Sequence, residues 1–196
     1  MKLMDEPFAC LVIADESAEF PAALTYAGIV ARGAGWRLVM LRVIEPSDPA
    51  PWATISEEIR RQAQDAAESL TQRFAAEIWA ECGISAEPVL REGDLKPEMR
   101  KLLEEDRSIK LVVLAAAQGP GGPGPLVAQL GKQGLGGRAV PVLVVPGSLS
   151  KDEIRALALP VGAAAAGLTA RGADEKPKVG HKTKFAANCE MWWGKI

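Results

Sequence analysis

Five short segments of the chain are almost continuously apolar, and each is followed by acidic, proline or glycine residues. Apolar runs of this length that are rich in branched side chains are typical of strands buried on both faces of a parallel sheet. The predicted strands are residues 8–14, 36–44, 86–91, 110–117 and 140–145.

The segments between these strands carry apolar residues at intervals of three and four, which is the pattern of amphipathic helices. The predicted helices are residues 18–32, 54–81, 95–105, a weaker segment that ends near residue 135, and 151–157. In the longest helix an apolar stripe runs from Ile55 to Cys82, and the positions between are largely charged or amide residues. We therefore expect this helix to lie on the sheet, with Gly83 at its end.

Strands and helices alternate through most of the chain, and this order predicts an α/β fold built on a single, doubly wound parallel sheet. The chain divides into an α/β domain at residues 1–149, a short C-terminal helix at 150–159 and a C-terminal extension at 160–196. The extension is low in complexity, contains six basic residues against three acidic ones, and shows neither a helical nor a strand period. A segment of this kind is expected to be disordered.

The charge and the aromatic content argue against binding to nucleic acids. Lys and Arg number 23 and Asp and Glu number 25, which gives a formal net charge of −2. Aromatic residues make up 5% of the chain, too few for a surface that stacks bases. We expect no nucleic-acid partner.

Cysteine and histidine are too few and too scattered for the common metal and catalytic sites. Cys10, Cys82 and Cys189 form no C-x-x-C pair, which argues against a disulfide framework and a zinc site. The single histidine, His181, lies in the extension, so the body of the protein cannot build a histidine triad. No apolar stretch is long enough for a membrane span, and the N-terminus is unlike a secretory signal. We expect a cytoplasmic protein without a structural metal.

In doubly wound sheets, ligands bind beyond the carboxyl ends of the strands, where the strand order reverses. In this chain that position falls after the first and fourth strands, at Asp15 and in the glycine-rich loop 118–125. The residues DESAEF after the first strand are not the G-x-G-x-x-G of dinucleotide-binding proteins, and no strand is followed by G-x-x-x-x-G-K-[ST]. A G-x-S-x-G nucleophile elbow is also absent. These three classes of enzyme are therefore excluded.

The glycine-rich loop has two interpretations from residue chemistry alone. Its small residues would let backbone N–H groups approach a di- or triphosphate, with Asp15 bonding a ribose or base across the crevice. Alternatively, the loop is a flexible surface segment and Asp15 only caps the first helix. Pro120, Pro123 and Pro125 each remove an N–H donor, which weakens the phosphate interpretation.

Four segments of the chain resemble the universal stress protein family. The segment FACLVIADESAEFPAALTYAGIVARGAGWRLVMLRVIEP resembles its opening β-α-β unit, with a strand that ends in an Asp-x-Ser turn. REGD at 91–94 resembles the end of its third strand, and KLVVLAAA and AVPVLVVPG at 139–147 resemble its last two strands. The resemblance covers residues 8–147 and implies a five-stranded parallel sheet of order 3-2-1-4-5, flanked by helices. It also implies a homodimer formed through the last strand and a role in survival under stress.

Some members of that family bind ATP through a G-x2-G-x9-G-[ST] motif after the fourth strand. Gly121, Gly124 and Gly134 match its glycines, and together with Asp15 they are the cofactor-binding residues that the resemblance implies. Leu135 stands where the motif has Ser or Thr, and only six residues separate Gly134 from Pro141, too few for the helix found in ATP binders. We therefore expect adenine-nucleotide binding to be weak or absent.

The function predicted from the sequence is that of a stress-response regulatory or protective protein that is dimeric and not an enzyme. The alternative is a genuine ATP-binding universal stress protein that hydrolyses ATP slowly. A ligase or nucleotidyltransferase of the adenine-nucleotide α-hydrolase group is disfavoured, because DESAEF is neither S-G-G-x-D-S nor H-x-G-H. A receiver domain is disfavoured because Arg91 and Pro146 stand where its acceptor Asp and its Lys would be.

Overall fold

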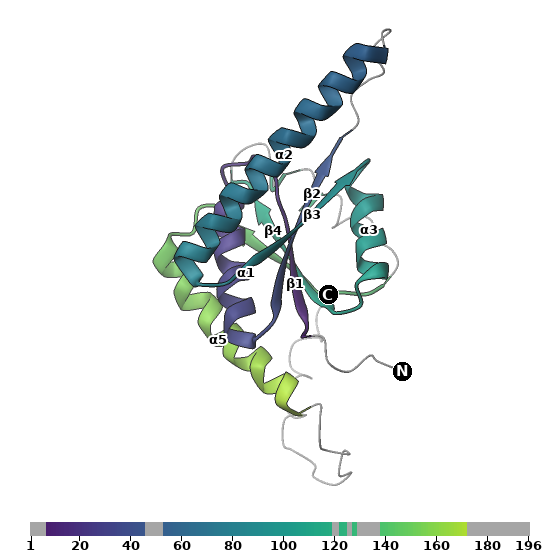
Figure 1. The fold of residues 1–196 in the computed structure, drawn as a ribbon. Coiled ribbons are helices and arrows are strands. Elements are labelled where there is room, and N and C mark those ends of the chain that lie inside the picture. The colour runs from purple at the N-terminus through teal and green to yellow at the C-terminus, as the bar shows by residue number, and fades with distance from the viewer. Residues whose placement is uncertain (1–6, 46–52, 119–121, 125–126, 129–137, 172–196) are drawn as a thin grey trace, which may run out of the picture.

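The computed structural model describes residues 7–45, 53–118, 122–124, 127–128 and 138–171. Five parallel strands form one sheet in the order β3-β2-β1-β4-β5 (Figure 1). The strands are β1 (Ala9–Ile13), β2 (Arg37–Ile44), β3 (Ala86–Glu92), β4 (Ile109–Ala116) and β5 (Val142–Pro146). The predicted sheet and its strand order are confirmed.

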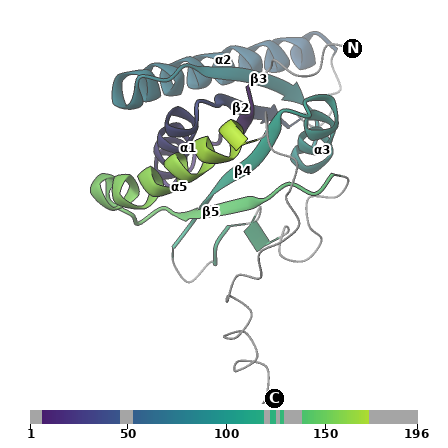
Figure 2. The ribbon, with the colours of Figure 1, turned by 90° about the horizontal axis from the view of Figure 1, so that it is seen from below.

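Four helices are described, and they cover both faces of the sheet (Figure 2). They are α1 (Phe20–Ala34), α2 (Ala53–Cys82), α3 (Leu95–Glu105) and α5 (Lys151–Arg171). Helices α1, α2 and α5 pack on one face and α3 packs on the other, as a doubly wound sheet requires. The helix that we expected to end near residue 135 lies mostly outside the described residues.

The central strand β1 shows why both faces of the sheet must be covered. Cys10 and Val12 point to the face of α1 and α2, whereas Ala9, Leu11 and Ile13 point to the face of α3. All five side chains are at most 5% exposed. Alternation along a strand sends successive side chains to opposite faces, so an apolar run without polar interruptions is stable only between two layers.

Only the second half of α2 lies on the sheet, which corrects the expectation for the whole helix. Phe74 and Ile78 are buried against α1 and the sheet, whereas Ile59 is 39% exposed and Ala66 is also exposed. Figure 1 shows the first half of α2 rising past the ends of the strands. The reason is length, because 30 residues of helix span about 45 Å. The longest strands have 8 residues and span roughly 26 Å.

The last helix is longer than the sequence pattern predicts. Helix α5 begins with a capping box, in which the Glu153 N–H donates to Ser150 Oγ at 3.3 Å and the Ser150 N–H donates to Glu153 Oε2 at 2.9 Å. It then continues past Pro160 to Arg171. The predictions that the last helix ends by residue 159 and that the extension is non-helical from residue 160 are therefore both wrong. The alanine-rich stretch after Pro160 has the highest intrinsic helix propensity, which offsets the one hydrogen bond that proline removes. The rest of the extension lies outside the described residues.

Candidate nucleotide-binding site

The chain leaves β1 and β4 toward opposite faces of the sheet. After β1 it enters α1 on one face, and after β4 it reaches Val127, which packs against the core on the face of α3. Strands β1 and β4 are parallel neighbours, so both connections start at the same edge of the sheet. This divergence is the topological switch point at which ligands bind in open α/β sheets.

Asp15 organises the turn that follows β1. Its Oδ1 atom accepts a hydrogen bond from the Ser17 backbone N–H at 3.0 Å and another from the Ser17 hydroxyl at 2.6 Å. The N-cap of α1 is Glu19, which makes no side-chain capping bond. The interpretation of Asp15 as the cap of the first helix is therefore wrong. The residue is half-buried and forms an Asx turn at the carboxyl end of β1.

The same turn occurs a second time, at the opposite end of the sheet, where the amino ends of the strands lie. Asp106 Oδ1 accepts from the Ser108 N–H at 2.9 Å and from the Ser108 hydroxyl at 2.6 Å, directly before β4 begins. An Asp-x-Ser turn is therefore a local backbone structure that this chain forms at both the amino and the carboxyl ends of its strands. Only the Asp15 turn lies at the carboxyl edge, so its position rather than its motif makes it a candidate for ligand binding.

Arg42 is a cation beside this turn that the sequence analysis missed. Its guanidinium donates to the Ala14 carbonyl at 3.4 Å and pairs with Glu16 at 3.0 Å, and its side chain is only 22% exposed. It thereby ties the turn after β1 to the end of β2. The signal in the sequence is a charged residue inside the apolar run of a strand, on the side that faces α1.

The described part of the glycine-rich loop comprises residues 122–124. Gly122 has φ +80° and Gly124 has φ +90°, a left-handed backbone that side-chain-bearing residues rarely adopt. The Gly124 carbonyl accepts from the Ala128 N–H at 3.1 Å, so a helical turn starts directly after the loop. Gly121 and Gly134, the other two predicted site residues, lie outside the described residues. Of the predicted site residues that are described, Asp15 follows β1 and Gly124 follows β4, and these two strands are neighbours in the sheet.

The described part of the chain offers little reactive chemistry. Burial raises the pKa of the Cys10 thiol to about 12, so it stays protonated and inert at neutral pH. Within the described ranges, no three His, Cys, Asp or Glu side chains lie close enough together to hold a metal ion. Among the described helices, none is long and apolar enough to cross a membrane.

Comparison with known proteins identifies the family. The model of the universal stress protein family matches residues 9–146, which is most of the chain. The chain belongs to the universal stress protein family. No curated protein sequence matches this universal stress protein significantly. The family match confirms the resemblance that the strand and turn sequences show.

Solved structures of universal stress proteins share the fold at low sequence identity. UspA from Lactobacillus plantarum is 18% identical with a TM-score of 0.59, and the match covers 71% of this chain and 98% of that one. A universal stress protein in complex with cAMP is 16% identical with a TM-score of 0.53, covering 74% and 100% of the two chains. One from Archaeoglobus fulgidus in complex with dAMP is 14% identical with a TM-score of 0.50, covering 73% and 99%.

Proposed function

We propose that this universal stress protein is a cytoplasmic stress-response regulatory or protective protein that works as a homodimer without efficient catalysis. We further propose that its carboxyl-edge crevice binds adenine nucleotides, and binds them weakly. The observation that carries the nucleotide proposal is the position of the Asp15 turn at the carboxyl end of β1, next to β4, whose following segment has glycines with positive φ. The two structural relatives that hold cAMP and dAMP support adenine as the base.

The weakness of binding follows from the donors that the crevice offers. The amides of Gly122 and Gly124 can donate to a phosphate, but Pro123 between them has no N–H. The described residues between β4 and β5 before Arg138 include no lysine or arginine. The Arg42 guanidinium is already paired with Glu16. A site that relies on a few neutral donors is expected to bind in roughly the millimolar range, near −4 kcal/mol.

The test is titration calorimetry of the full chain with AMP and with ATP and Mg²⁺. We expect weak binding that Asp15→Ala abolishes and that Asp15→Asn, which keeps the acceptor of the turn, weakens less. Asp106→Asn is the matched control, because it alters the same kind of turn at the opposite edge of the sheet. It should leave nucleotide affinity unchanged.

Two results would overturn this proposal. Micromolar ATP binding that is lost in Asp15→Ala would instead favour the alternative, a genuine ATP-binding universal stress protein, and ATP hydrolysis would then be assayed. Weak binding that survives Asp15→Ala would show that the nucleotide sits elsewhere.

The homodimer proposal rests on a difference between the two edge strands. On β5, Val142 and Val144 are 37% and 41% exposed, and the strand contains no charged residue. On β3, the exposed positions include Glu87, which pairs with Arg37 at 2.6 Å, and Pro88, which has no N–H to offer a further strand. Charged side chains and a proline inside a strand block pairing at a sheet edge. Strand β5 has no charged residue and its proline, Pro146, is its last residue, so we expect that edge to pair with a second copy.

Light scattering coupled to size-exclusion chromatography tests the dimer. The unmodified protein should elute with the mass of a dimer, and Val144→Lys should shift it to a monomer, because two lysines would face each other across a symmetric β5 contact. Glu87→Gln on the opposite edge is the control and should stay dimeric. A monomeric unmodified protein, or a dimer that tolerates Val144→Lys, would contradict the proposal.

A further inference from the structure

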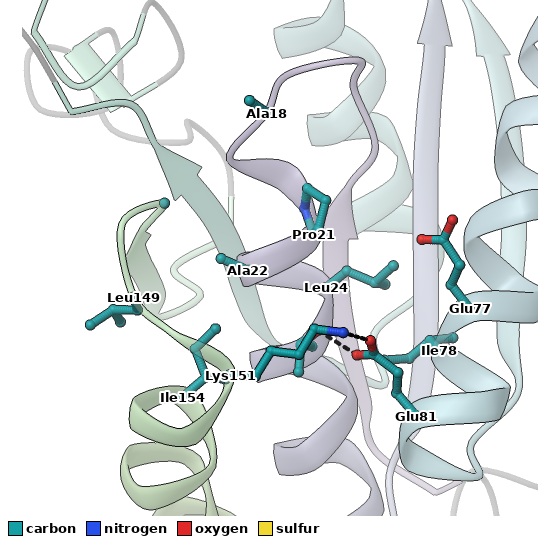
Figure 3. A pocket seen from close by; sticks show the side chains of 12 residues that line it. Ala18, Pro21, Ala22, Leu24, Glu77, Ile78, Glu81, Leu149, Lys151 and Ile154 are labelled. Carbon is teal, nitrogen blue, oxygen red and sulfur yellow. Dashed lines mark hydrogen bonds and ion pairs between the residues drawn. The ribbon is translucent and has the colours of Figure 1, made fainter.

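Two cavities lie on the α1 face of the molecule, and neither is lined by Asp15 or by residues 122–124. The Lys151 cavity, shown in Figure 3, has a volume of about 240 Å³ and is lined by residues of α1, α2 and α5 together with Ala18, Gly147 and Leu149. The Arg155 cavity has a volume of about 350 Å³ and lies farther along the same three helices. Thr25 and Glu81 line both cavities and so mark the boundary between them.

Glu81 at this boundary is fully engaged by its neighbours. Lys151 of α5 forms an ion pair with Glu81 Oε1, and the Thr25 hydroxyl of α1 donates to Glu81 Oε2 at 3.0 Å. The hydrogen bond from Lys151 is the main reason that the pKa of Glu81 is lowered, so the carboxylate is ionised at neutral pH. Lys151 is the main partner of this carboxylate, and the charge of Arg155 also lowers its pKa, so Glu81 offsets part of the positive charge of the Arg155 cavity.

The Arg155 cavity combines two guanidinium groups with apolar walls. Arg32 donates to the Cys82 carbonyl, and among the described residues no carboxylate lies within 4 Å of its guanidinium. Arg155 has a long ion pair of 3.7 Å with Asp152, whose side chain is 96% exposed, so this pair contributes little. Ile29 and Leu159 supply apolar surface to the same cavity. The cavity thus has an excess of positive charge next to a hydrophobic wall.

We propose that the Arg155 cavity is a binding site for a small amphipathic carboxylate, such as a medium-chain fatty acid. The carboxylate would accept hydrogen bonds from Arg155 and Arg32, since a guanidinium presents paired N–H groups that match two carboxylate oxygens. The hydrocarbon chain would lie against Ile29 and Leu159, of which Leu159 is 61% exposed without a ligand. The volume lies at the small end of the range for ligand pockets, which suits a single short chain.

The Lys151 cavity does not have this character, although it is lined by the same helices. Its charged residues are Glu77, Glu81 and Lys151, so acids outnumber the single cation. An anion would meet net repulsion there. Charge complementarity therefore selects the Arg155 cavity, and the site is independent of the proposed nucleotide crevice at the carboxyl edge.

Titration calorimetry of the full chain with octanoate, octanol, octylammonium and acetate tests this site. Octanoate should bind at least tenfold more tightly than the other three, because only octanoate has both the charge and the chain. Arg155→Ala should weaken octanoate binding by at least tenfold, and Leu159→Ser should weaken it while leaving acetate unaffected. Arg100→Ala removes an exposed guanidinium from α3 on the opposite face, and Asp15→Ala alters the nucleotide crevice. Both should leave octanoate affinity unchanged.

The proposal fails if octylammonium or octanol binds as tightly as octanoate, or if Arg155→Ala and Arg100→Ala behave alike. Circular dichroism of each variant establishes that it is folded before titration. Should Arg155→Ala unfold, Arg155→Gln keeps the Cβ–Cγ–Cδ stem of the side chain and removes the charge. Perturbation of the Ile29 methyl resonances by octanoate gives an independent location of the ligand, and unperturbed Ile29 methyls would contradict this cavity.

Discussion

The two halves of α2 share a helical spacing of apolar residues and have very different surroundings. Both carry apolar residues at helical spacing between charged ones, and both contain an isoleucine on the apolar stripe. In the second half Ile78 is 1% exposed against α1 and the sheet, whereas in the first half Ile59 is 39% exposed. A periodic apolar stripe therefore shows that a helix can be buried, but the extent of the sheet decides how much of it is.

The largest difference between the halves should appear when the two isoleucines are replaced. We expect Ile78→Ala to lower the free energy of unfolding by about 2–5 kcal/mol, since it leaves a cavity in the core. Ile59→Ala should change it by less than about 0.5 kcal/mol, because the side chain is exposed and alanine is a good helix former. Urea denaturation measures both values, and equal losses would mean that the first half is also packed in solution.

A second variant sharpens the comparison at the contact between α1 and the buried half of α2. A Cβ atom on Gly28 would lie 2.5 Å from Ile78 Cδ1, which is closer than real atoms approach. Gly28→Ala should therefore destabilise the protein by about 1 kcal/mol, because overpacking outweighs the gain in helix propensity. In the Ile78→Ala background the same change should be stabilising. Urea denaturation of the four proteins in this cycle checks the sign, and additive effects would contradict the contact.

The smallest effects should come from the ion pairs that link each half of α2 to the rest of the fold. Arg60 of the first half pairs with Glu92 of β3 at 2.8 Å, and Glu81 of the second half pairs with Lys151 of α5. The Arg60 side chain is 70% exposed, so a double-mutant cycle with Glu92→Ala should give a coupling of about 0.2–1 kcal/mol that falls in high salt.

The pair in the second half should also be visible as a dependence of stability on pH. The pKa of Glu81 is lowered chiefly by the hydrogen bond from Lys151, so the native state binds that proton less readily than the unfolded chain does. The contribution of Glu81 to the free energy of unfolding is present at pH values above the ordinary glutamate pKa. It is lost as the pH falls through the lowered pKa of the native state. In the Glu81→Gln variant, the free energy of unfolding should therefore fall less steeply as the pH is lowered. Urea denaturation at several acidic pH values measures this dependence. An unchanged pH dependence would contradict the pair.

Some features of the candidate nucleotide-binding site can be predicted from the sequence, and others cannot. Asp15 was chosen as a candidate because it follows the first apolar run, and ligands of open α/β sheets bind beyond the carboxyl ends of the strands. The role of the turn could not be found, because Asp106 and Ser108 make the same hydrogen bonds at an edge without a crevice. Arg42 was missed because its partner Glu16 is distant in sequence and lies beside it only through the pairing of β1 with β2.

The sequence by itself determined the elements of this protein, their order and the family to which it belongs. Those features depend on local patterns: branched apolar runs for strands, periodic stripes for helices, and glycine at positive φ such as Gly35 at the end of α1. The tertiary structure alone decided that α2 extends beyond the sheet and that Arg32 and Arg155 share a cavity. The physical reason is that burial and charge pairing depend on which elements meet in space, and a local pattern does not specify its partner.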